Sequence, residues 1–157
     1  MNDKDLLLLL IAGAAIALGI WLWRRFRRPD ITKLYQPKTI LTDREYEFYT
    51  RLLPVAEEYG LFVLMKVRLA DLLEPKPKDV NPLWMECFNK IKAKHIDFAL
   101  ADRDTNIVCL IELDDSTHAR ADRTERDIFV DAILGNTGYA LLRTYGETQI
   151  IEDFLGR

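Results

Sequence analysis

The chain has 157 residues, of which 49% are hydrophobic and 30% charged, a composition that indicates a globular protein and excludes a disordered one. Its formal net charge is −3, and because the first 28 residues carry a net charge of +3, the remainder is near −6. An acidic domain gains little from long-range attraction to nucleic acid, which counts against a protein that coats DNA regardless of sequence. The two cysteines, Cys87 and Cys109, have no metal-like spacing and indicate no disulfide framework, which suits a reducing compartment.

An apolar segment near the N-terminus predicts a membrane anchor. Residues 6–23, LLLLLIAGAAIALGIWLW, are uncharged, and as a helix they would just span a bilayer core of about 30 Å. Trp21 and Trp23 stand where an interfacial aromatic belt is expected. A buried core helix and a cleaved signal peptide are the alternatives, but a signal peptide carries its basic residues before the apolar segment.

The charges on the two sides of this segment predict its orientation. Four arginines follow it between residues 24 and 28, whereas one lysine and two aspartates precede it. By the positive-inside rule we expect a single crossing of the cell (inner) membrane, with the N-terminus outside and the C-terminal domain in the cytoplasm. The predicted parts of the chain are an anchor with its basic flank at residues 1–28, a linker at 29–40 and a domain at 41–157.

The domain is predicted to mix helices and strands. Thr42, Asp43 and Glu45 have the capping-box spacing that begins a helix, and Pro54 is expected to kink or end that helix. Periodicity and turn residues then predict a strand at 61–69, a loop at 71–81, a helix at 81–93, strands at 95–100 and 107–113, a helix at 117–134, a strand at 139–144 and a helix at 147–155. This order predicts an α/β fold, in which helices flank a small mixed sheet.

Carboxylates gather at one end of the hairpin predicted for residues 95–113. Asp97 lies inside an otherwise apolar strand, and Glu112 and Asp114 stand at the end of the next strand. Side chains alternate between the faces of a strand, so Glu112 and Asp114 share one face. Acids in apolar strands are costly unless they are paired, and a divalent cation with oxygen ligands is the simplest way to neutralise them.

The order of elements and the positions of these acids resemble the PD-(D/E)XK nuclease superfamily, whose restriction-endonuclease-like core is α-β-β-β-α-β. Glu45 falls on the first helix, Asp97 on the second strand, and Glu112 and Asp114 at the end of the third. IELDDSTH followed by RTERDIFVDAILGNTGYALLR is similar to the very-short-patch-repair-endonuclease-like branch. That branch has an acid-x-Asp-Gly-x-x-His motif, then an arginine and an aspartate on a helix, then a strand that ends in Leu-Arg.

Within that branch the chain is most similar to an uncharacterised bacterial domain family marked by four motifs. These are LTxxExxFY at residues 41–49, VRLADLL at 67–73, KHxDF at 94–98 and IELDD at 111–115. Each motif is weak alone, but the four occur in order at sensible spacing. The resemblance covers about Ile40 to Tyr145, most of the C-terminal domain.

The chain departs from the superfamily pattern at two positions. The lysine expected two residues after the acid is Asp114, and the usual glycine after it is Asp115. This leaves open which cation, if any, polarises the phosphate, and the candidates are Lys94, Arg126 and Arg143. Of these, Lys94 is expected on the strand face opposite Asp97.

The resemblance implies a membrane-anchored, metal-dependent nuclease that hydrolyses DNA or RNA. Asp97 and Glu112 would hold Mg²⁺ (or Mn²⁺), with Asp114 assisting. His118 would act as a general base or steady the leaving oxygen, and Glu45 would bind a second metal or orient water. A capping box alone also explains Glu45, and a helix start alone also explains His118.

Two readings without catalysis stand beside this one. The same fold, tethered to the membrane, would serve as an inactive module that binds nucleic acid or a protein partner. The acidic net charge, the absent lysine and the anchor all favour it. A purely structural assembly domain is the third reading.

Overall fold

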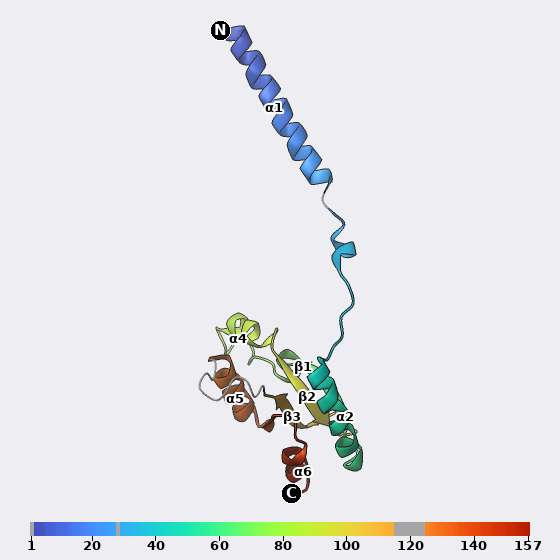
Figure 1. The fold of residues 1–157 in the computed structure, drawn as a ribbon. Helices are drawn as coiled ribbons and strands as arrows, with labels where there is room; N and C mark the ends of the chain where they lie inside the picture. The colour runs from blue at the N-terminus through green and yellow to red at the C-terminus, as the bar shows by residue number, and fades with distance from the viewer. Residues whose placement is uncertain (1, 28, 115–124) are drawn as a thin grey trace. The chain divides into compact units, whose positions relative to one another are not determined.

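The computed structural model describes residues 2–27, 29–114 and 125–157. The chain divides into two compact units, Met1–Lys38 and Thr39–Arg157. Figure 1 shows the secondary structure of both units.

The first unit is one long helix followed by a short turn. Helix α1 (Asp3–Phe26) begins with a capping box in which Asn2 and Asp5 each bind the other's backbone N–H. It has 24 residues, none of them buried, and by length and composition it could cross a membrane. The 3₁₀ helix η1 (Ile31–Leu34) follows, capped by the side chain of Asp30. The predicted helix therefore forms, whereas its crossing of a membrane and its orientation stay predictions.

The second unit contains a four-stranded mixed sheet in the order β1-β2-β3-β4. Its strands are β1 (Phe62–Arg68), β2 (His95–Ala101), β3 (Ile107–Leu113) and β4 (Leu141–Thr144). β1, β2 and β3 are antiparallel neighbours, whereas β4 pairs with β3 in parallel. A parallel pair needs a long crossover connection, and the chain between β3 and β4 contains a helix. The predicted mixed α/β fold is confirmed.

Helices pack on both faces of this sheet (Figure 1). They are α2 (Asp43–Glu58), α3 (Leu69–Leu72), α4 (Trp84–Ile91), α5 (Glu125–Thr137) and α6 (Gln149–Leu155). Helix α5 ends before Gly138, whose φ of +82° is a conformation that suits glycine at a helix end. The predicted start of this helix at residue 117 lies outside the described residues.

Pro54 does not end α2, contrary to one of the two outcomes predicted for it. The helix continues to Glu58 because Leu52, Val55 and Ala56 on either side of the proline are all buried in one core. Tertiary packing thus offsets the lost backbone hydrogen bond.

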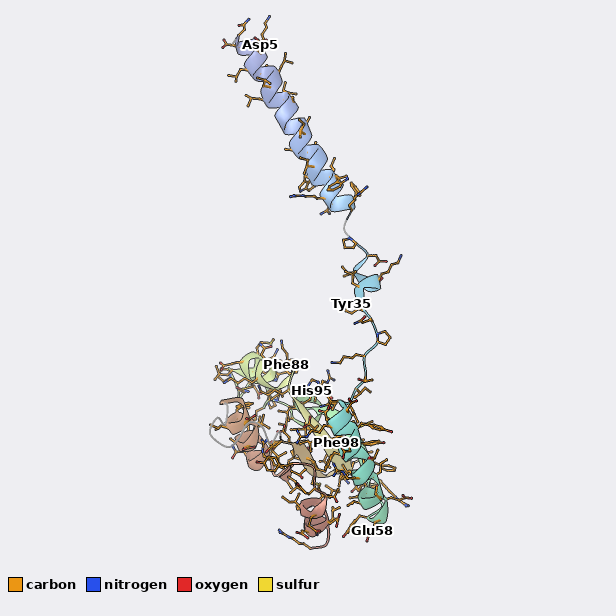
Figure 2. All side chains as sticks on the ribbon, in the orientation of Figure 1. Asp5, Tyr35, Glu58, Phe88, His95 and Phe98 are labelled. Atoms are coloured by element: carbon orange, nitrogen blue, oxygen red, sulfur yellow. The ribbon has the colours of Figure 1, made fainter. Side chains whose placement is uncertain are left out.

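Two apolar clusters form the core, one on each face of the sheet. The first cluster joins α2 and α6 to the sheet, and its fully buried rings include Phe48 and Phe98. Phe98, labelled in Figure 2, lies on β2, and its ring centroid is 5.4 Å from that of Phe48 on α2. The second cluster joins α3, α4 and α5 to the other face, around Leu110 and Leu134. Burial of these clusters fixes which face of the sheet each helix covers.

Strand β1 breaks the expected alternation at Lys66. Val63 packs against the first cluster and Val67 against the second, although residues four apart on a regular strand share a face. Lys66 lies between them with φ +53°, in the left-handed region that is rare for a residue with a side chain. The left-handed residue therefore turns the side chains at the end of β1 toward the other face of the sheet.

Strand β2 breaks its alternation opposite this point. Phe98 belongs to the first cluster and Ile96 to the second, so the exchange takes place at Asp97. Met65 pairs with Phe98 and Val67 with Ile96, which sets Lys66 and Asp97 opposite each other. Alternation along the strand predicts one face for Asp97 and Ala99; this prediction is wrong, since Ala99 lies in the second cluster and Asp97 points to the α2 side. The apolar pattern gives no sign of this local exchange.

Candidate functional site

Lys66 joins two acids from different elements. Its Nζ lies 2.5 Å from Oε1 of Glu45 and 2.8 Å from Oδ1 of Asp97. Glu45 comes from the first turn of α2, and Asp97 from β2. The three side chains retain between 15% and 28% of their exposure, so the group is partly shielded but still reachable from solvent. We call these three residues the Lys66 cluster.

Glu45 performs two tasks with its two oxygens. Oε2 accepts the backbone N–H of Thr42 at 2.8 Å, which completes the predicted capping box, and Oε1 accepts from Lys66. The cap therefore holds the carboxylate in one orientation at the start of the helix. A capping role and a role in the site are compatible because they use different atoms.

The charges of the Lys66 cluster stabilise one another. Burial by itself would lower the pKa of Lys66, but the hydrogen bonds to Asp97 and Glu45, together with their charges, outweigh it and raise that pKa. Burial would likewise raise the pKa of Glu45, but the hydrogen bonds from Lys66 and Thr42 hold it below its ordinary value. Lys66 and Glu45 are thus both ionised at neutral pH.

Arg143 gathers three further acids on the α5 side of the sheet. Nη1 lies 2.8 Å from Oε2 of Glu112 and 3.0 Å from Oδ1 of Asp114, and Nη2 lies 2.9 Å from Oδ1 of Asp131. The parallel register of β3 and β4 pairs Glu112 with Arg143 directly. Burial would lower the pKa of Arg143, but the hydrogen bond to Asp131 and the three negative charges raise it. These four residues form the Arg143 cluster.

Backbone contacts connect the two clusters at one edge of the domain. The N–H of Leu113, between Glu112 and Asp114 in the sequence, donates to Oδ2 of Asp97 at 3.1 Å. Arg44, the neighbour of Glu45, donates from Nη2 to the carbonyl oxygens of Asp114 and Tyr145. The end of β3 therefore lies against both the Asp97 carboxylate and the start of α2.

The structure brings four of the five predicted site residues to this edge. Glu45 and Asp97 lie in the Lys66 cluster, and Glu112 and Asp114 in the Arg143 cluster. His118 lies outside the described residues.

The cations proposed from the sequence have different positions. Arg143 contacts the acids, whereas the Nζ of Lys94 lies 6.0 Å from the ring centroid of Phe129 on α5. Arg126 belongs to α5, but its side chain is outside the described part of the structure. Arg143 is thus the one of the three whose described contacts include site acids.

The carboxylates can be tested as ligands for a divalent cation. Within residues 2–27, 29–114 and 125–157, no group of three or more His, Cys, Asp or Glu side chains lies close enough to hold a metal. Mg²⁺, however, is commonly bound by one or two carboxylates together with water and substrate phosphate oxygens. Phe98 pairs with Ile111, and the same register continued by one residue sets Asp97 opposite Glu112. The two carboxylates are hard oxygen donors of the kind that Mg²⁺ prefers.

Sequence reasoning missed Lys66 and Asp131. Lys66 carries the same signal that singled out Asp97, a charge within an apolar strand, since it interrupts LFVLMKV. Regular alternation from Val63 would set it on the face opposite α2, and only the antiparallel register sets it opposite Asp97. Asp131 gave no such signal because an acid on a helix face is usually solvated.

Comparison with known proteins identifies the family of the C-terminal unit. Residues 37–156 match the model of the family described as Protein of unknown function (DUF2726), which covers most of the chain. No curated protein and no solved structure matched the chain. The chain therefore belongs to this family of unknown function.

Proposed function

We propose that the C-terminal unit is a metal-dependent phosphodiesterase that hydrolyses DNA or RNA. One observation carries the proposal: the N–H of Leu113, the residue after Glu112, binds the Asp97 carboxylate at 3.1 Å, which connects the two acid-bearing strands at this point. Both acids interrupt apolar strands, a costly arrangement for a surface that needs no charge there. The resemblance to the PD-(D/E)XK superfamily supports the same chemistry.

Asp97 and Glu112 would hold Mg²⁺ or Mn²⁺, with Asp114 in support. When bound, such an ion lowers the pKa of water and stabilises the charge that develops on phosphate. Asp97 is already oriented by Leu113 and Lys66, and Glu112 by Arg143. These contacts hold the carboxylates in place before any ligand arrives.

Groups around the two acids suit a nucleic-acid backbone. A surface pocket beside the Arg143 cluster is lined by Arg143, Thr144, Tyr145 and Gln149, together with the acids Glu147 and Asp153, and it offers an aromatic ring to a nucleotide. His118, three residues beyond Asp115, is proposed as general base or as the group that steadies the leaving oxygen. The resemblance implies that Glu45 orients water or binds a second ion, but its contacts with Thr42 and Lys66 favour a positioning role.

We also propose that α1 anchors this enzyme in the cell membrane. The arginines after the apolar segment favour a cytoplasmic C-terminal unit. Such an enzyme would act on nucleic acid close to the bilayer surface.

A substrate screen tests the proposal. The full chain in detergent would be incubated with single-stranded and double-stranded DNA and RNA, with Mg²⁺, with Mn²⁺ and with chelator. Cleavage that needs the metal and is lost on Asp97→Asn supports the enzyme. The absence of cleavage on every substrate, with no heat of Mg²⁺ or Mn²⁺ binding in calorimetry, would contradict it.

A binding module without catalysis is the second candidate. It is favoured by the ion pairs of the site, since Asp97 already contacts Lys66, and Glu112 and Asp114 already contact Arg143. Nucleic acid bound without cleavage, with an affinity independent of divalent metal, would support this candidate over the enzyme.

A further inference from the structure

The backbone at Lys66 is held in an unfavourable conformation. Its φ of +53° lies in the left-handed region, which costs a residue with a side chain roughly 1 kcal/mol or more. Glycine would remove this cost, yet the chain has lysine there. Such strain concentrates at functional sites, where the position of a side chain is kept at some cost to the stability of the fold.

The strain has a clear geometric effect. Regular alternation from Val63, which packs on the α2 side, would turn Lys66 to the other face of the sheet. The left-handed residue instead directs the ammonium to Glu45 on α2 and to Asp97. An ordinary surface ion pair stabilises a fold by about 0–1 kcal/mol, which would not offset the backbone strain at Lys66.

Lys66 is also the cation best placed for a ligand of Asp97. Position 114, where the resemblance leads us to expect a lysine, holds Asp114, which contacts Arg143. Arg143 itself is divided among three carboxylates, and Lys94 lies over Phe129. The ammonium of Lys66 contacts Asp97 while 28% of the side chain remains exposed, so a phosphate at Asp97 would be within its reach.

We propose that Lys66 is a catalytic residue that binds the scissile phosphate, with Glu45 as the residue that positions it. This inference rests on the proposed phosphodiesterase activity. Phosphate would take over part of the hydrogen bonding that Asp97 now provides, while the capped Glu45 keeps the ammonium in place. The negative charge that develops on the phosphate in the transition state would then lie against a fixed cation.

Kinetics of the full chain in detergent tests this role. Lys66→Met retains most of the side-chain stem and removes the charge, and Lys66→Arg retains the charge. We expect Lys66→Met to lower kcat at least a hundredfold with KM changed less than threefold, and Lys66→Arg to recover part of kcat. Lys66→Met that cleaves at the wild-type rate would overturn the proposal, as would equal loss in both variants.

Thermal unfolding separates strain from simple ion pairing. Because glycine is favoured at this φ, we expect Lys66→Gly to melt at a higher temperature than Lys66→Met, with cleavage equally lost. Thr105, an exposed turn residue with φ +67°, is the matched control: Thr105→Gly should raise the melting temperature and leave cleavage unchanged. Lys66→Gly melting below Lys66→Met would contradict the strain that the proposal requires.

Cleavage by the wild type distinguishes the role of Lys66 from the phosphodiesterase activity itself. A wild-type chain that cleaves no nucleic acid removes the phosphodiesterase itself. A wild-type chain that cleaves with metal, alongside a fully active Lys66→Met variant, removes only the role of Lys66.

Discussion

Lys66 and Asp97 face each other across β1 and β2 where both strands exchange faces of the sheet, and their side chains form an ion pair of 2.8 Å. The exchange brings the pair to the first turn of α2, where Glu45 completes it. It also brings Asp97 to the N–H of Leu113 at the end of β3. A local backbone feature in an edge strand thus organises carboxylates from two elements, α2 and β2, and a backbone N–H from β3.

Replacement of Arg143 by methionine should destabilise the fold. The change leaves Glu112, Asp114 and Asp131 together without their shared guanidinium, and the side chain is only 22% exposed. We expect the free energy of unfolding to fall by about 2–3 kcal/mol in chemical denaturation. Saturating Mg²⁺ should stabilise Arg143→Met more than the wild type, since the acids have lost a competing cation.

The matched control is Arg51→Met, which removes an exposed ion pair with Glu47 at 3.6 Å. Its effect on the unfolding free energy should stay within about 0.5 kcal/mol. Equal stability of Arg143→Met and Arg51→Met would show that the Arg143 cluster contributes nothing.

The contribution of Glu45 to stability should depend on pH. Its pKa is held below the ordinary 4.5 in the folded chain, so ionised Glu45 stabilises the fold above that pH. Glu45→Gln retains an acceptor for the capping box but lacks the charge. We expect the difference in unfolding free energy between wild type and Glu45→Gln to be constant near neutrality and to shrink as pH falls below 4.5. A difference that persists unchanged into acid would refute the ion pair as its source.

The anchor makes a separate prediction about fractionation. If α1 spans the bilayer, the full chain should remain in the membrane pellet after an alkaline carbonate wash. A spanning helix is apolar on all sides and is held by the hydrocarbon core rather than by charges that the wash disrupts. A chain that starts at Thr39 should be released into the supernatant. Release of the full chain by carbonate would contradict a spanning helix.

The apolar pattern predicted the fold and much of the site because both depend on local signals. Asp97 and Glu112 were identifiable as charges inside apolar strands, and Glu45 as part of a capping box. The pairing of Arg143 with Glu112 depends on the parallel register of β3 and β4, which no local pattern specifies. The role of Lys66 was not predicted from the sequence. A single left-handed residue changes which face of the sheet the following side chains point to, without any change in composition.

Single-turnover cleavage is the most direct test of the central claim, that Asp97 and Glu112 form a metal-dependent phosphodiesterase site. Wild type, Asp97→Asn and Glu112→Gln would be compared in excess over a labelled nucleic-acid substrate at saturating Mg²⁺. We predict cleavage by the wild type and a loss of at least about a hundredfold in both variants, which retain their shape but lose a ligand charge. Cleavage by either variant at the wild-type rate, or none by the wild type, would contradict the account.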